Sequence, residues 1–186
     1  DFFGLADCNN FYCSCERVFH PDLRYKPVIV LSNNDGCVVA RSEESKKLGI
    51  KMGVPFYKIR DLVEKNNVAV FSSNYNLYGD MSRRVMSLLS SFFPKINIYS
   101  IDEAFIDLSE IEDIGCLVGI SHKAVKSINK GVGIPVSLGI APTKTLAKMA
   151  SVFAKKHKGY NGVCIIDTDE KREKALKLFP VGDVWG

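Results

Sequence analysis

The sequence predicts an α+β fold, with a mostly antiparallel sheet flanked by helices. Short strand-like apolar runs and amphipathic stretches alternate irregularly along the 186 residues, and two pairs of strand-like runs are separated by hairpin-length turns. The sequence contains no internal repeat and no low-complexity linker. Because a doubly wound parallel sheet needs regular alternation of strands and helices, this order favours antiparallel pairing.

The first part of the chain predicts a strand, a hairpin and a short helix. Residues 2–6 form an apolar run that stops at Asp7, which indicates a buried strand with a carboxylate at its end. The β-branched runs 28–32 and 37–40 flank an Asn-Asn-Asp-Gly turn, a pattern typical of a hairpin. A short helix then begins after Ser42, a typical N-cap, because acidic residues open it and lysines close it.

The remaining elements follow from periodicity and punctuation. A helix over 77–92 is predicted by an apolar stripe at three- and four-residue intervals, and Pro94 ends it. The elements expected after it are strands at 96–101 and 104–108, a helix at 114–129, a strand at 136–140, a helix opened by Pro142-Thr143, a strand at 163–166 and a charged helix at 169–178.

Composition indicates a reduced, cytoplasmic protein. The longest apolar runs have the length of strands, far short of the ~20 residues that a membrane span needs. The chain opens without the basic and apolar regions of a secretory signal. Its six cysteines lack the paired spacing of a structural zinc site, so we expect reduced and mostly buried thiols.

The charges are distributed unevenly along the chain. Residues 1–120 carry 13 Lys and Arg against 16 Asp and Glu, a net −3, whereas residues 121–186 carry 12 against 5, a net +7, for the total of +4. A positive segment suits a polyanion such as nucleic acid, because neutralised phosphates release counterions. A lysine-rich helix is also compatible with an ordinary solvated surface.

Asp102 and Glu103 are the sharpest local feature. Two adjacent carboxylates between apolar strands are costly unless something compensates them, and a divalent cation such as Mg²⁺ is a natural partner. Asp7, also at a strand end, could supply a third carboxylate, as a two-metal site for nucleotidyl transfer requires. The alternative is a solvent-exposed hairpin tip, since turns often carry Asp.

Six segments, in order along the chain, resemble UmuC-type Y-family DNA polymerases. They are 7–16 (Asp-Cys-Asn-Asn-Phe-Tyr-Cys-Ser-Cys-Glu), 31–41, 71–75, 99–105, 139–148 and 184–186. The resemblance implies a ferredoxin-like palm formed by residues 1–10 and 74–166, a small inserted fingers lobe at 11–73, and the start of a thumb at 167–186. It also implies that the chain ends inside the thumb and lacks the little finger, so this fragment is expected to bind metal and nucleotide but to polymerise weakly or not at all.

The implied activity is error-prone translesion synthesis in SOS DNA damage tolerance, by template-directed nucleotidyl transfer with two Mg²⁺ ions, for which Mn²⁺ can substitute. The implied metal ligands are the catalytic carboxylates Asp7, Asp102 and Glu103, with the backbone carbonyl of Cys8. The implied nucleotide-binding residues are Phe11, Tyr12, Arg41, Lys46 and Lys155, and the implied DNA-binding residues are Lys144 and Lys148.

Tyr12 matches the family's steric gate, an aromatic ring that excludes the ribose 2′-hydroxyl by collision. A core aromatic beside Phe11 is the alternative for Tyr12, and ordinary surface lysines are the alternative for Lys46 and Lys155. Glu43 departs from relatives of the DinB type, many of which have a phosphate-contacting tyrosine at this position. UmuC-type sequences lack that tyrosine too.

The resemblance further implies primer–template DNA, deoxynucleoside triphosphates, processed UmuD, a recombinase filament and the sliding clamp as partners, no membrane, and a bacterial, nucleoid-associated location. One alternative is a non-catalytic scaffold that recruits polymerases, although inactive relatives have lost the carboxylates that this chain retains. Another is a nucleotide cyclase on a related palm, but the hairpin of diguanylate cyclases reads Gly-Gly-Asp/Glu-Glu-Phe, whereas residues 100–104 read Ser-Ile-Asp-Glu-Ala.

Overall fold

A computed structural model describes residues 1–179. The chain divides into two compact units, which we call the main unit (Asp1–Asn9 and the chain from Ser82 onward) and the inserted unit (Asn10–Met81). Helix and strand segments are mixed in both units, so the predicted α+β class is confirmed. The predicted palm, fingers and thumb are assignments by role and stay predictions, and the motif at 184–186 lies outside the described residues.

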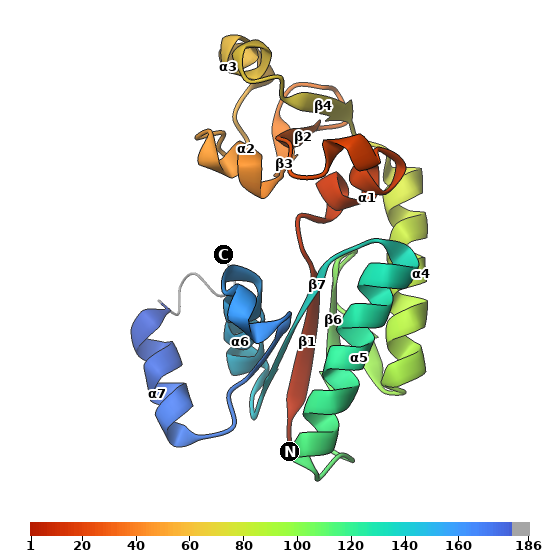
Figure 1. The fold of residues 1–186 in the computed structure, drawn as a ribbon, viewed down its shortest axis with the longest axis vertical. Coiled ribbons are helices and arrows are strands. Elements are labelled where there is room, and N and C mark those ends of the chain that lie inside the picture. The colour runs from red at the N-terminus through yellow and green to blue at the C-terminus, as the bar shows by residue number, and fades with distance from the viewer. Residues whose placement is uncertain (180–186) are drawn as a thin grey trace. The chain divides into compact units, whose positions relative to one another are not determined.

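The main unit is built on a five-stranded sheet with β1 in its centre (Figure 1). The strands, in the order β5-β6-β1-β7-β8, are β5 (Ile96–Ile98), β6 (Glu103–Asp107), β1 (Phe3–Cys8), β7 (Val136–Ala141) and β8 (Val163–Ile165). Every neighbouring pair is antiparallel except β7 and β8, which are parallel. The expected antiparallel sheet is therefore confirmed, and the first strand of the chain is its central strand.

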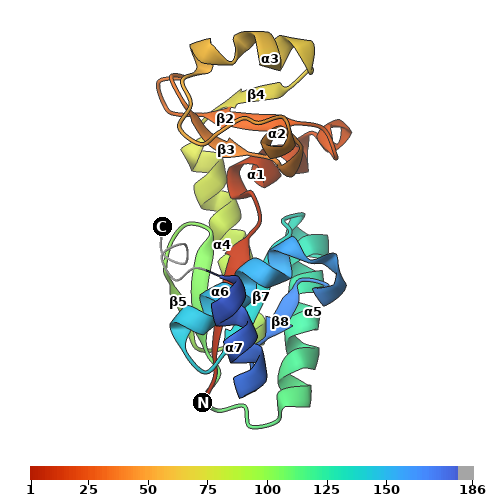
Figure 2. The same ribbon diagram turned by 90° about the vertical axis from the view of Figure 1, so that its left-hand side faces the viewer.

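Helices cover both faces of this sheet (Figures 1 and 2). The helices are α4 (Tyr75–Phe92), which begins in the inserted unit, α5 (Ile114–Val132), α6 (Lys144–Lys156) and α7 (Asp169–Leu178), and η3 (Lys158–Tyr160) is a 3₁₀ turn. α6 lies on one face, and α5 lies on the opposite face. Side-chain caps fix two of the helix starts: Asp113 accepts hydrogen bonds from the first turn of α5, and the Thr143 hydroxyl accepts one from the Leu146 amide.

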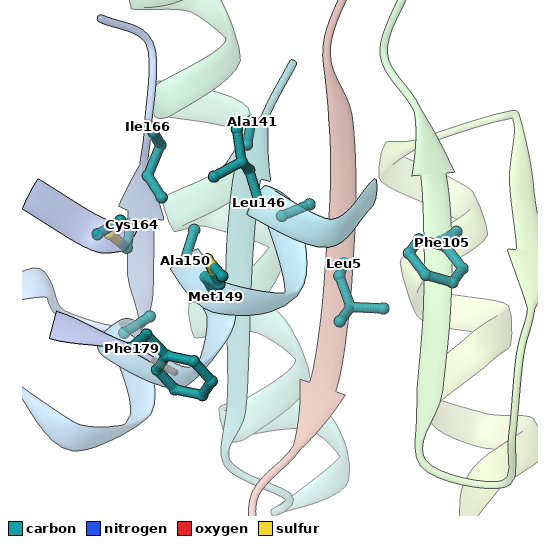
Figure 3. Close-up of a cluster of buried hydrophobic side chains, with 12 residues drawn as sticks. Leu5, Phe105, Ala141, Leu146, Met149, Ala150, Cys164, Ile166 and Phe179 are labelled. Carbon is teal, nitrogen blue, oxygen red and sulfur yellow. The ribbon is translucent and has the colours of Figure 1, made fainter. Parts of the chain in front are cut away.

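The core beneath α6 fixes which strand positions face that helix. Leu5 and Phe105 are opposite each other on β1 and β6, and both belong to the same buried cluster as Leu146 and Met149 of α6 (Figure 3). Because strand side chains alternate between faces, the residues two positions along from Leu5 and Phe105 lie on this same face. Those residues are carboxylates, as described below.

Gly139 allows α6 to approach β7 unusually closely. A Cβ atom at this position would lie 2.1 Å from both the Ala147 carbonyl oxygen and the Ser151 nitrogen, which are backbone atoms of α6. A flexible side chain could move aside, but a helix backbone cannot do so locally. The absence of a side chain at Gly139 therefore sets the distance between α6 and the sheet.

The inserted unit contains a second, three-stranded sheet in the order β3-β2-β4. Its elements are α1 (Phe11–Phe19), η1 (Pro21–Leu23), β2 (Val28–Leu31), β3 (Val38–Arg41), α2 (Glu43–Lys47), η2 (Phe56–Lys58), α3 (Arg60–Lys65) and β4 (Ala69–Ser72). The predicted hairpin is confirmed, because β2 and β3 pair antiparallel. The predicted cap is confirmed as well, since the Ser42 hydroxyl accepts a hydrogen bond from the Ser45 amide.

Several elements differ from the sequence-based expectation. α1, α3 and β4 were not predicted, because none of them is marked by a long apolar period. Asp7 lies within β1 rather than after it. The strand expected over 96–101 ends at Ile98, because the chain bends at residues 100–102 before β6 begins.

Two predictions from composition were tested by the fold. Four of the six cysteines are buried free thiols, as expected, and Cys116 is exposed. Among residues 1–179, no helix combines the length and the apolar character that a membrane crossing requires.

Candidate functional site

Three carboxylates lie at one end of β1 and β6, which are neighbouring strands of the main unit. Asp7 on β1 is directly opposite Glu103 on β6, so their side chains emerge on the same face of the sheet. Asp102 immediately precedes β6, and its carbonyl oxygen accepts a hydrogen bond of 2.9 Å from the Cys8 amide. Residues almost a hundred positions apart in the sequence are thereby held together by backbone pairing.

Asp102 lies in the bend at residues 100–102 that precedes β6. The Ser100 hydroxyl donates to Asp102 Oδ1 at 2.8 Å and lies 3.3 Å from Glu103 Oε2, and so ties the two carboxylates together. Burial raises the pKa of Asp102, the nearby charge of Asp7 adds to this increase, and the Ser100 hydrogen bond opposes it. Keeping Asp102 ionised in the folded protein therefore costs free energy of folding.

Two lysines of α6 neutralise the other two carboxylates. The Lys155 ammonium lies 2.8 Å from Asp7 Oδ2, and the Lys148 ammonium contacts Glu103 Oε1. Residues seven positions apart are two helical turns apart, so both lysines project from one face of α6 toward the sheet. Burial lowers the pKa of Lys148, and the negative charge of Asp7 opposes this effect.

The chemistry of these donors fits a hard divalent cation. Carboxylate oxygens that converge from two adjacent strands are the ligands that Mg²⁺ prefers. In the part of the chain that the structure describes, no group of three or more His, Cys, Asp or Glu side chains is already arranged so that it could hold a metal ion. The positive charge beside Asp7 and Glu103 is instead supplied by lysine.

The inserted unit holds Tyr12 in an aromatic cluster. Its ring is stacked on that of Tyr78, with centroids 4.4 Å apart and an interplanar angle of 16°, and Tyr75 meets both rings edge-on. The Tyr78 hydroxyl donates a hydrogen bond of 2.8 Å to the buried carboxylate of Glu16. The position of the Tyr12 ring is therefore fixed by a polar anchor within the same unit.

Comparison with known proteins identifies the lineage of this arrangement. The model of the impB/mucB/samB family matches residues 6–152, most of the chain. The chain belongs to this family. Residues 6–152 include all three carboxylates and Lys148, so the geometry described above lies within the family's common region, with Lys155 just beyond it.

Relatives of the family align over nearly the whole chain. The chain is 50% identical to protein ImpB and 47% identical to protein UmuC, both of Salmonella typhimurium, over 99% of its length. It is 34% identical to DNA polymerase IV of Picrophilus torridus over 98% of its length. It covers 44% of the first two relatives and 52% of the third, so it spans about half the length of the curated relatives that it matches.

Solved structures share the fold as well. An insertion ternary complex of Dbh DNA polymerase has a TM-score of 0.83 and 27% identity, covering 96% of this chain and 52% of that one. DinB from Sulfolobus solfataricus has a TM-score of 0.80 and 28% identity, covering 91% of this chain and 49% of that one.

The other predicted site residues of this family member have these positions. Phe11 is buried in the inserted unit, where the Lys46 ammonium lies 2.9 Å from both Asn10 Oδ1 and Glu43 Oε1. Arg41 donates to the Ile50 carbonyl at 2.8 Å, and its buried Nε has no hydrogen-bond partner within the described chain. In the main unit, the Lys144 ammonium lies over the ring of Phe105, 5.1 Å from its centroid.

Three residues that support the site were missed from the sequence. Glu16, Tyr78 and Ser100 each hold a predicted site residue or its neighbour in place. Ser100 could have been noticed, because a hydroxyl two residues before Asp102 can bond it across a turn. The partnership of Glu16 with Tyr78 joins residues 62 positions apart, and no local pattern indicates it.

Replacing Tyr78 by Phe tests the anchor of the aromatic cluster. The change removes the hydroxyl and leaves the buried Glu16 carboxylate without this donor, so we expect the free energy of unfolding to fall by about 1–3 kcal/mol. Chemical denaturation monitored by circular dichroism measures the effect. Tyr75→Phe is the matched control, because Tyr75 is exposed and its ring contacts survive the change. An equal effect of both changes would contradict the anchoring role.

Proposed function

We propose that this chain is the catalytic core of an error-prone translesion DNA polymerase that acts in SOS DNA damage tolerance. The observation that carries this proposal is the convergence of Asp7, Asp102 and Glu103 at the end of β1 and β6. Membership of the impB/mucB/samB family and similarity to chains named DNA polymerase IV support the same activity. The reaction is template-directed nucleotidyl transfer from a deoxynucleoside triphosphate to a primer 3′-hydroxyl.

Asp7, Asp102, Glu103 and the Cys8 carbonyl are the proposed metal ligands, and the ions are two Mg²⁺, for which Mn²⁺ can substitute. When bound, the two ions would activate the attacking hydroxyl and stabilise the charge of the triphosphate. Lys155 in the main unit, and Arg41 and Lys46 in the inserted unit, would contribute further positive charge to triphosphate binding. Phe11 and Tyr12 would contact the nucleotide itself.

Primer–template DNA is the proposed macromolecular substrate. Lys144 and Lys148 would contact its phosphates without reading its sequence, as a polymerase requires, and the net +7 of residues 121–186 supports this role. Processed UmuD, a recombinase filament and the sliding clamp are further proposed partners of the whole protein. A bacterial, nucleoid-associated location follows from these partners.

Primer extension by the intact protein tests the proposal. We expect Mg²⁺-dependent addition of deoxynucleotides to a primer annealed opposite a damaged template, and much weaker synthesis by the 186-residue chain alone. The absence of templated addition by intact, folded protein in the presence of its partners would overturn the proposal. Processive synthesis by the 186-residue chain would contradict the expectation that this chain alone polymerises weakly.

Replacing Tyr12 by Ala tests the proposed selection of the sugar. The change removes a ring that would collide with a ribose 2′-hydroxyl, so we expect the preference for deoxynucleotides over ribonucleotides to fall by about 10²-fold or more, which corresponds to roughly 3 kcal/mol. Steady-state kcat/KM for the two nucleotides, measured with the intact protein, gives the ratio. An unchanged ratio would reduce Tyr12 to a packing residue of the aromatic cluster.

A further inference from the structure

Two of the three carboxylates of the site are each paired with a lysine of the same chain. The Lys155 side chain is 29% exposed and its partner Asp7 is 10% exposed, while the Lys148 and Glu103 side chains are 16% and 15% exposed. Ion pairs that are exposed on a protein surface contribute little to stability, because water competes for both charges. These two pairs are instead largely shielded from water. Each ammonium group therefore occupies one carboxylate oxygen, Asp7 Oδ2 or Glu103 Oε1, that a cation would need.

The two ion pairs follow from the backbone fold and do not depend on a chance side-chain conformation. Asp7 and Glu103 emerge on the sheet face that α6 covers, because they lie two positions from Leu5 and Phe105. Gly139 lets the α6 backbone approach that face closely. The spacing of seven residues between Lys148 and Lys155 then directs both side chains to the same face of the helix.

An ammonium group and a divalent ion cannot share the same carboxylate oxygens without strong repulsion. We propose that Lys148 and Lys155 are internal counter-cations of the carboxylate site, which a divalent ion must displace from Glu103 and Asp7 in order to bind. The inference rests on the proposed function in one respect, namely that these carboxylates are metal ligands. It assigns to Lys148 a role in metal affinity that differs from the contact with DNA.

The displacement couples metal binding to phosphate binding. Once released from the carboxylates, the two ammonium groups need another anion, and the phosphates of a nucleotide bring one to the site together with the metal. A nucleotide therefore lowers the cost of displacement and increases the affinity for the metal, and by linkage the metal increases the affinity for the nucleotide. The site remains neutralised by its own lysines until both ligands arrive.

The test measures Mn²⁺ binding to the intact protein by electron paramagnetic resonance, without nucleotide, for Lys148→Met. Met keeps most of the length of the side chain but removes the competing charge, so we expect Mn²⁺ to bind about threefold to tenfold more tightly than to wild type. Lys156→Met is the matched control: it removes the same charge from the same helix, but Lys156 is exposed and lies over the ring of Phe179. We expect its Mn²⁺ affinity to stay within about twofold of wild type.

Nucleotide provides a second readout from the same samples. We expect a deoxynucleoside triphosphate to increase Mn²⁺ affinity less in Lys148→Met than in wild type, because one of the two displaced charges is absent. Lys155→Met, which frees Asp7 in the same way, supplies the measurement without nucleotide if Lys148→Met does not fold. Circular dichroism establishes folding for each variant.

The outcomes separate the inference from the function. If wild type binds Mn²⁺ with nucleotide but Lys148→Met binds it no more tightly than Lys156→Met, the counter-cation role is overturned and the proposed metal site stands. If neither wild type nor Lys148→Met binds Mn²⁺ under any condition, the metal site and the inference both fall. Tighter binding that is specific to the variants that free a carboxylate supports the inference.

Discussion

Asp7→Ala and Asp102→Ala are each expected to reduce templated nucleotide incorporation by the intact protein by at least about 10³-fold. Each change removes one of the three carboxylates that converge at the end of β1 and β6. Single-turnover primer extension in Mg²⁺ measures the loss. Activity within tenfold of wild type in either variant would remove that residue from the mechanism.

Loss of the fold would not explain the result for Asp102. Burial raises the pKa of this carboxyl above its usual value, so the native state binds its proton more readily than the unfolded state does. The contribution of Asp102 to stability is therefore largest at low pH and decreases as pH rises through the raised pKa, which means that its charge costs stability at neutral pH.

Asp107→Ala is the matched control, since Asp107 is an exposed carboxylate at the far end of β6.

Gly139→Ala is expected to lower the free energy of unfolding by about 3 kcal/mol or more. The added methyl group would lie 2.1 Å from two backbone atoms of α6, so the whole helix must move away from the sheet. That movement would also withdraw Lys148 and Lys155 from the carboxylates. Chemical denaturation followed by circular dichroism measures the change in stability.

Gly119→Ala separates this clash from the general effect of adding a methyl group. Gly119 lies within α5, and a Cβ atom there would have no neighbour within 4 Å. Because Ala favours a helix over Gly, we expect this change to stabilise the protein by about 0.5–1 kcal/mol. If Gly139→Ala proved as harmless as Gly119→Ala, the close contact between α6 and β7 would be wrong.

The sequence predicted elements whose signals are local. The helix expected at 169–178 is α7 with the same bounds, and the caps at Ser42 and Thr143 could be recognised from residue type and position. α1 was missed, because its apolar positions lie among cysteines and its N-cap residue, Asn10, has a left-handed backbone without a side-chain cap. Short elements of this kind depend on tertiary contacts that a local pattern does not contain.

The candidate site was likewise predictable from the sequence only in part. The grouping of Asp7 with Asp102 and Glu103 could be predicted, because acidic residues at the ends of apolar strands indicate adjacent strand ends. The pairing of Lys148 with Glu103 could not, because it depends on how closely α6 approaches the sheet, which Gly139 sets from a separate strand. From the sequence alone, Lys148 was predicted to contact DNA. This role remains a prediction, and in the structure Lys148 contacts Glu103.

The central position of β1 has a consequence for synthesis of the protein on the ribosome. This strand is synthesised before both of its partners, because β6 and β7 do not exist until residues 103–107 and 136–141 have been added. Until then, a strand that is buried in the folded protein remains outside the exit tunnel with both edges unpaired. We expect nascent chains stalled before residue 141 to be bound by chaperones or to aggregate, whereas chains released beyond β8 contain all five strands of the sheet.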